Sequence, residues 1–156
     1  MSKGPPSLYG YSLFCDDLRR EEGGKITLVG VYSSEMIIFG SFPVTLPKLA
    51  LIVTYVERPG QSHEPLELAI YFPGDADGEP SHRRSLPAEM LEEFRRQRPE
   101  PDAEDPILTM RLDWMFSPVN IKQEGRIKVR MNRGGTEIKL GTLRITTRSP
   151  SAAQAT

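Results

Sequence analysis

The chain of 156 residues is poor in the residues that build reactive and metal-binding sites. It has one cysteine and two histidines, so an internal disulfide and a thiolate zinc centre are both excluded. Cys15, His63 and His82 have no metal-ligand spacing, and the sequence contains neither a glycine-rich phosphate loop nor a serine nucleophile elbow. These absences predict a protein with no cofactor and no metal, and they argue against an enzyme.

Long apolar segments and a strong overall charge are also missing. The longest apolar run, residues 49–53, is far shorter than the about 20 residues that cross a membrane. Residues 1–8 lack the apolar centre of a signal peptide. With 20 Lys and Arg against 21 Asp and Glu, the chain is neither a globally basic nucleic-acid binder nor an acidic disordered protein. We therefore expect a cytoplasmic protein with no membrane contact.

The sequence does have apolar residues that alternate with polar ones at period two, which is the pattern of half-buried strands. Only residues 87–97 have helical spacing, with Pro87 in the first turn and Pro99 after the end. An antiparallel β-sandwich of about eight strands with one short helix is therefore predicted. The segments that read as strands are residues 8–15, 26–32, 48–56, 66–72, 108–116, 126–131 and 137–147.

The apolar positions also predict which side of each strand faces the core. Residues 48–56 are apolar on both faces, as in a central strand. Trp114 and Phe116 share the inward parity of their strand. On the first strand the bulky residues occupy one face, which we assign to the core. That face carries Tyr9, Tyr11, Leu13 and Cys15.

Gly134 and Gly135 predict a type I′ hairpin, because both central positions of that turn require a positive φ. The apolar parity changes after Leu140, so a β-bulge is predicted at residues 141–142. The predicted register of the hairpin pairs Met131 with Ile138, Val129 with Leu140, and Arg130 with Lys139. The pair of Arg130 with Lys139 brings two like charges together, which is unfavourable.

One domain is predicted over residues 1–148, followed by a flexible tail at 149–156. Residues 73–106, which are polar and rich in proline, glycine and acids, are interpreted as an insertion that carries the helix at 87–97. Asp75, Asp77 and Glu79 resemble the start of a calcium loop. Pro80 and Leu86 occupy the positions where that loop needs glycine and glutamate, so a solvated turn is the simpler interpretation.

Adjacent carboxylates at Asp16 and Asp17 are candidates for acid/base chemistry or for metal binding, in a predicted loop at residues 16–24. Neighbouring side chains of an extended chain point to opposite faces, so the pair is expected to diverge. A structural motif that includes Arg19, with backbone capping and ion pairing, is the simpler interpretation. A hydrolase that uses these carboxylates or a histidine remains the third alternative for function.

Charge is distributed unevenly along the chain. Residues 57–105 contain thirteen acids and six bases, whereas residues 122–148 contain eight bases and two acids. The outward bases of the final hairpin suit phosphates or an acidic partner. Acids such as Glu67 offer an internal neutralisation, which we favour, and the segment lacks the interleaved aromatic residues of a single-strand platform. The candidate anion-binding residues are Arg126, Lys128, Arg130 and Lys139.

A short apolar run with glycine and proline nearby predicts an edge strand or a crossover. If it is exposed, such a run forms a surface for a partner or for self-association. The candidate partner-binding residues are Met36, Ile37, Ile38, Phe39 and Phe42.

The segments F-C-D-D-L-R at residues 14–19 and G-K-I-T-L-V-G-V-Y at 24–32 carry a resemblance. They are similar to the signature F-C-D-D-[IL]-R … G-K-x-[ST]-L-[IV]-G-[IV]-Y of a family of small bacterial and phage-associated proteins of unknown function. The resemblance covers residues 9–56, continues weakly over 125–145 and has no counterpart for 73–105. It implies an immunoglobulin-like β-sandwich and assigns no catalytic residues.

These observations predict a non-catalytic module for binding or assembly that acts through protein–protein contacts and self-associates into a homo-oligomer. The alternative is an electrostatic binder of nucleic acid or nucleotides that uses the basic face of the final hairpin.

Overall fold

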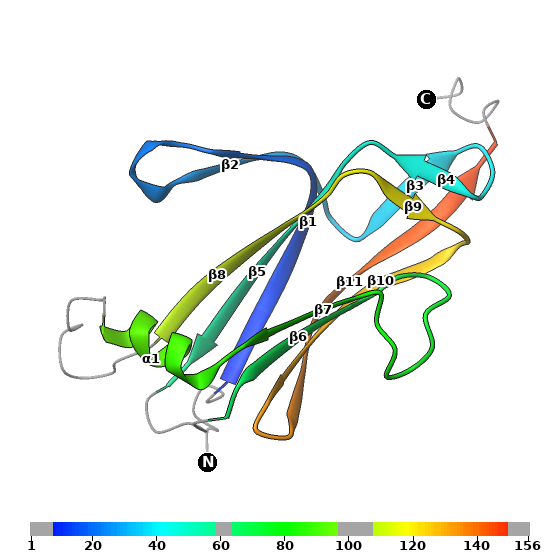
Figure 1. The fold of residues 1–156 in the computed structure, drawn as a ribbon. Coiled ribbons are helices and arrows are strands. Elements are labelled where there is room, and N and C mark those ends of the chain that lie inside the picture. Colours follow the sequence, from blue (N-terminus) through cyan, green and yellow to red (C-terminus); the bar gives the residue numbers. More distant parts are fainter. Residues whose placement is uncertain (1–7, 59–63, 97–107, 150–156) are drawn as a thin grey trace, which may run out of the picture.

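The computed structural model describes residues 8–58, 64–96 and 108–149 (Figure 1). Within these ranges the chain is mostly β-strand, with one α-helix, α1 (Ala88–Arg96), and a short 3-10 turn at Glu22–Gly24. No helix in these ranges is long and apolar enough to cross a membrane. The strands are β1 (Leu8–Arg20), β2 (Ile26–Tyr32), β3 (Glu35–Phe39), β4 (Val44–Leu46), β5 (Leu49–Glu57), β6 (Leu66–Tyr71), β7 (His82–Leu86), β8 (Leu108–Phe116), β9 (Val119–Ile121), β10 (Gly125–Arg133) and β11 (Thr136–Arg148).

The strands form two larger sheets and one small one. The first sheet has the order β2-β1-β5-β8, the second has the order β3-β11-β10-β6-β7, and β4 pairs with β9. All pairs are antiparallel except β3 with β11. Figure 1 shows the far half of β1 and all of β2 as a hairpin arm that lies on the side of the first sheet facing away from the second sheet. The chain is therefore a β protein with mixed, open sheets.

Both larger sheets contribute to one hydrophobic core. Leu51 and Val53 come from the first sheet, and Leu68, Ile127 and Val129 come from the second; all five are at most 1% exposed. The alternation predicted for residues 66–72 and 126–131 is confirmed, because every second residue of β6 and β10 is buried. The core thus consists of side chains from strands that are far apart in sequence, and the helix α1 adds Leu91.

The face of β1 that we assigned to the core is wrong for three of its four residues, whereas Cys15 is buried. Tyr9, Tyr11 and Leu13 are 43%, 51% and 37% exposed, and the inward positions hold small residues, including Gly10 and Ser12. The reason is that β1 and β11 lie very close together on the inner side. The Ser12 hydroxyl donates a hydrogen bond to the Leu140 carbonyl at 2.9 Å, and a Cβ at Gly10 would lie 2.7 Å from Leu140 Cδ2. Small residues are therefore needed at these two positions, whereas Phe14, further along the same side of β1, is buried in the core.

The final hairpin confirms the predicted turn, because Gly134 and Gly135 both have positive φ values, 56° and 79°. The pairs Met131–Ile138 and Arg130–Lys139 are confirmed. The predicted Val129–Leu140 pair is wrong, since Val129 lies opposite Gly141. Leu140 is therefore the extra residue, and the bulge lies one position before the predicted one. The bulge allows Leu140 and Leu143, which have opposite parity, to be buried together.

Two segments predicted as loops contain strands. β1 continues through Asp16 to Arg20, which pairs with Ile26. In the predicted insertion, β7 pairs with β6, and the side chains of Leu86 and Leu91 are buried in the core. The helix predicted at 87–97 is confirmed as α1. Residues 97–106 of the insertion and 150–156 of the predicted tail lie outside the described residues.

Candidate functional site

Asp16 and Asp17 are held by different partners. Asp16 accepts a hydrogen bond from the hydroxyl of Tyr32 on β2. Asp17 Oδ1 pairs with Lys48 Nζ at 3.1 Å and accepts the amide of Leu18 at 2.9 Å. Lys48 and this amide lower the pKa of Asp17, whereas burial and then the bond to Asp16 raise the pKa of Tyr32. The two carboxylates do not form a pair, as expected for neighbours in a strand.

The signature residues of the hairpin arm fit together sterically. Gly30 has a φ of +67°, and a Cβ there would lie 2.2 Å from Asp16 Oδ2. Arg19 is exposed and pairs with Thr27 in the ladder. The conformation and lack of side chain at Gly30 therefore leave room for the carboxylate that binds Tyr32, which gives the motif a structural role.

Sequence reasoning missed a buried ion pair that joins the two sheets. Glu57 is 0% exposed and Arg133 is 2% exposed, with Arg133 Nη2 3.2 Å from Glu57 Oε1. The Tyr55 hydroxyl donates to Glu57, and Arg133 also donates to the carbonyl of Glu64. Strand parity was the available signal, because Arg133 follows Met131 on the inward face and Glu57 follows Tyr55. The pair connects the end of β5 to the end of β10.

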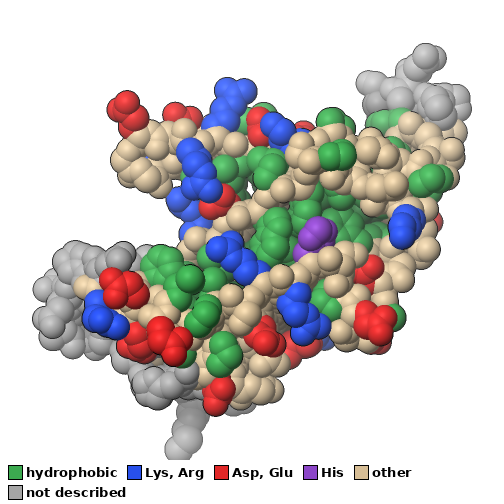
Figure 2. All heavy atoms as spheres, in the orientation of Figure 1, with side chains coloured by type: hydrophobic (Ala, Val, Ile, Leu, Met, Phe, Trp, Pro, Cys, Tyr) green, Lys and Arg blue, Asp and Glu red, His purple; other side chains and the backbone are tan. Residues whose placement is uncertain are grey.

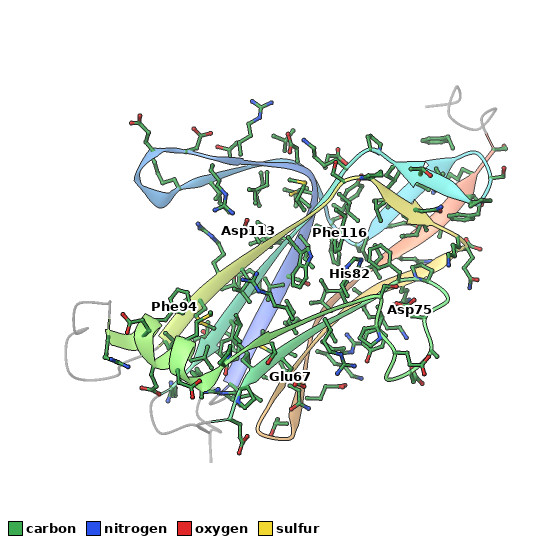
Figure 3. All side chains as sticks on the ribbon, viewed as in Figure 1. Glu67, Asp75, His82, Phe94, Asp113 and Phe116 are labelled. Atoms are coloured by element: carbon green, nitrogen blue, oxygen red, sulfur yellow. The ribbon has the colours of Figure 1, made fainter. Side chains whose placement is uncertain are left out.

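A cleft of about 310 Å³ lies beside β7 and the end of β8. Its aromatic lining includes Phe72, His82 and Phe116, whose ring centroids are between 4.8 and 5.6 Å apart. Figure 2 shows the histidine in a hollow that is bordered by apolar side chains. In Figure 3, His82 and Phe116 lie close together, with Asp75 on the neighbouring loop. The cleft is suited to holding an apolar group.

Side-chain contacts between β7 and β8, the two edge strands, continue beyond this cleft. β7 pairs only with β6, and β8 pairs only with β5, within the described parts of the chain. On β7, Arg84 lies over the ring of Trp114 on β8, with the guanidinium carbon 5.9 Å from the ring centroid. Trp114 packs against the core, as predicted. This contact links the two edges where no strand covers the interior.

Asp75 closes the loop between β6 and β7. Its carboxylate accepts hydrogen bonds from the amides of Phe72 at 2.8 Å and Ser81 at 2.7 Å, and from the Ser81 hydroxyl at 2.8 Å. Partial burial tends to raise the pKa of Asp75, but these hydrogen bonds outweigh it and the pKa lies below its ordinary value. Across the described ranges, no group of three or more His, Cys, Asp or Glu residues could hold a metal ion.

Replacing Asp75 with asparagine is expected to lower the free energy of unfolding by about 1–3 kcal/mol at pH 7, because hydrogen bonds to a charged acceptor are lost. The depressed pKa means that this contribution is present above the unfolded-state pKa, about 3.9, and is lost as the pH falls through the folded value. Urea unfolding at pH 7 and pH 3 measures both effects. Asp77→Asn in the same loop is the control, and an equal loss in both variants would contradict the assignment.

The predicted apolar patch is divided between two environments. Met36 and Ile38 on β3 are 3% and 8% exposed and belong to the core, and Phe42 packs against that core. Phe39 is 54% exposed, while Ile37 is half-buried. The structure therefore does not bring all five residues onto one exposed surface.

The first sheet instead exposes apolar side chains over its outer side, which we call the outer apolar face. Its buried members come from β5, where Ile52 and Val56 are 3% and 6% exposed. Strand register places Leu13 beside Ile52 and Tyr9 beside Val56. The exposed members are Tyr9, Tyr11, Leu13, Val31 and Met115, which are 37–52% exposed. This face corresponds to the apolar second side of β5 that the sequence indicated.

The hairpin arm is tied to the same side of the first sheet. Arg20 on the arm forms an ion pair with Asp113 on β8. Arg111 on β8 donates a hydrogen bond to the carbonyl of Gly24 at 3.1 Å. Figure 2 shows the arm standing away from the body, with basic and acidic side chains between them. The outer apolar face is thus bordered by charges of both signs.

The outer side of the second sheet carries six bases, which we call the basic face. Arg130 lies opposite Lys139, and Arg126 lies opposite Arg144. Arg83 is separated from Arg130 by one residue of β6. None of the six bases forms an ion pair with another residue of the described ranges. The basic face consists of Arg83, Arg126, Lys128, Arg130, Lys139 and Arg144.

The fold and these surfaces define a mainly β protein with one apolar and one basic outer sheet face. The chain belongs to the family of unknown function DUF6941, whose model matches residues 10–146. The signature segments at 14–32 and the acidic segment at 73–105 both lie within the matched span. Neither a curated protein nor a solved structure matches the chain.

Proposed function

We propose that this chain is a non-catalytic module for binding and assembly that acts through protein–protein contacts on its outer apolar face. The observation that carries the proposal is the exposure of Tyr9, Tyr11, Leu13, Val31 and Met115 on one side of one sheet. Contiguous apolar patches larger than a few hundred Å² are rare on monomeric soluble proteins and mark interaction sites.

The surroundings of the outer apolar face support a second copy of the chain as partner. An interface of this kind has an apolar centre and a polar rim, and Arg111 and Asp113 supply both charges at the rim. A two-fold symmetric contact places the same patch on both subunits, so it needs a surface that is complementary to itself. A rim that carries both signs meets this requirement.

We also propose that the two sheets form an immunoglobulin-like sandwich. Chain order supports it: β1, β5 and β8 take the places of strands A, B and E, and β7, β6, β10 and β11 take those of C′, C, F and G. The shared hydrophobic core agrees with that arrangement. The cytoplasmic location, and the bacterial or phage origin implied by the resemblance, stay predictions.

Tyr11→Glu and Val31→Glu are expected to abolish self-association and to leave the unfolding midpoint nearly unchanged, because both side chains are more than half exposed. Light scattering across a dilution series measures the association. Phe39→Glu on β3 is the matched control, since Phe39 is equally exposed and lies on the other sheet. A native chain that stays monomeric at every concentration contradicts the second copy as partner, and equal loss in the control contradicts the location.

A further inference from the structure

We propose that the basic face of the second sheet binds single-stranded nucleic acid. This function is independent of the assembly proposed above, because the two surfaces belong to different sheets. It rests on the arrangement of the six bases, on the absence of ion pairs between them and other residues of the described ranges, and on an aromatic residue that β6 contributes.

The bases form three neighbouring rows across the sheet. Arg126 with Arg144 is the first row, Lys128 is in the second, and Arg130 with Lys139 is in the third. Same-face residues of one strand are about 7 Å apart, and neighbouring strands about 5 Å apart. The rows therefore make a strip about 14 Å long and two strands wide, which is suited to the backbone of a nucleic-acid strand.

The fold does not neutralise this strip through ion pairs. Two pairs of like charges lie directly opposite each other, which is unfavourable in a sheet. Glu35 lies beside Arg144 in the ladder, where its carboxylate accepts a hydrogen bond from the Thr146 hydroxyl, and Glu67 and Glu137 lie one row beyond Arg130, where both flank Asn132. An anionic ligand on the strip would remove the repulsion that the isolated chain retains.

Tyr71 supplies the aromatic surface that the hairpin sequence lacks. It lies opposite Lys128, and both residues line a cavity of about 240 Å³ together with Arg130. A neighbouring cavity of about 130 Å³ forms where the small side chain of Ala69 separates Arg83 from Arg130. Proteins that bind single strands combine a basic surface with an aromatic ring on which a base stacks. Asp77 and Glu137 also line the first cavity, so modest affinity is expected.

Fluorescence anisotropy with a labelled twelve-residue oligothymidylate tests the proposal. Binding is expected at 50 mM salt and should weaken by about 50-fold at 200 mM, which corresponds to about four phosphates neutralised on a single strand. A duplex of the same length is expected to bind more weakly, because its bases are not free to stack on Tyr71. Absence of binding at 50 mM salt, or equal affinity for the duplex, overturns the proposal.

Lys139→Glu separates lost binding from lost folding. The change turns the like-charge pair with Arg130 into an opposite-charge pair, so the unfolding midpoint is expected to stay equal or to rise. The affinity for the oligonucleotide is nevertheless expected to fall at least tenfold. Tyr71→Ala is expected to lower it at least fivefold through the loss of stacking. Lys25→Glu makes the same charge change on the hairpin arm, and a comparable loss there would overturn the assignment to the basic face.

Discussion

Replacing Arg133 with methionine is expected to lower the free energy of unfolding by about 3–5 kcal/mol, because the carboxylate of Glu57 then loses its cationic partner in the interior. Glu57 is fully buried and Arg133 nearly so. The guanidinium also donates to the carbonyl of Glu64, so the change affects the start of β6 as well. Urea denaturation of the native chain and the variant measures the loss.

The loss of stability in Arg133→Met is expected to come from removing the cation beside the Glu57 carboxylate rather than from the change in side-chain shape. Combining Arg133→Met with Glu57→Gln should therefore recover a large part of the stability, since a buried pair that is removed as a unit leaves no uncompensated ion. Arg130→Met, on the outer side of the same strand, should change stability by less than about 0.5 kcal/mol. A double variant that is as unstable as the two single losses added together would count against this explanation.

Replacing Gly10 with alanine is expected to lower the free energy of unfolding by about 2–3 kcal/mol through overpacking. A Cβ at this position would lie 2.5 Å from the carbonyl oxygen of Thr54 and 2.7 Å from Leu140 Cδ2. Thr54 belongs to β5, which is paired with β1, so the backbone cannot move away without disturbing the ladder. The thermal midpoint and urea unfolding both report the effect.

Tyr9→Ala provides the comparison for Gly10, because it alters the outward neighbour on the same strand and creates no clash. We expect it to change stability much less than Gly10→Ala. A Gly10→Ala variant with native stability would show that β1 and β11 can separate at no cost, and would contradict their close approach.

Alternation predicted faces correctly where one side of a strand is apolar and the other carries charged residues. Ile127 and Val129 alternate with Arg126 and Lys128, so β10 has one consistent assignment. β1 offers no such contrast, because residues 8–15 carry no charge and each side of the strand includes an aromatic residue. The smaller side faces inward for a reason that only the position of β11 reveals.

The strand β7 had almost no sequence signal, because His82, Arg83, Arg84 and Ser85 precede its single apolar residue, Leu86. Hydrogen bonding to β6 makes it a strand, and that pairing depends on chain segments outside it. For the same reason the sequence identified Arg126, Lys128, Arg130 and Lys139 on one hairpin but could not place other members of the basic face. Arg83 and Tyr71 join them through sheet order alone.

The burial of Cys15 makes the reactivity of its thiol a measure of strand opening. Its thiol is fully buried, and burial, followed by the neighbouring charge of Asp16, raises its pKa, so the folded chain presents almost no thiolate to a reagent. Because Cys15 lies in the ladder between Val31 of the arm and Ala50 of β5, modification requires those strands to part. The rate at which a thiol reagent labels Cys15 in the native chain thus reports how often the arm opens.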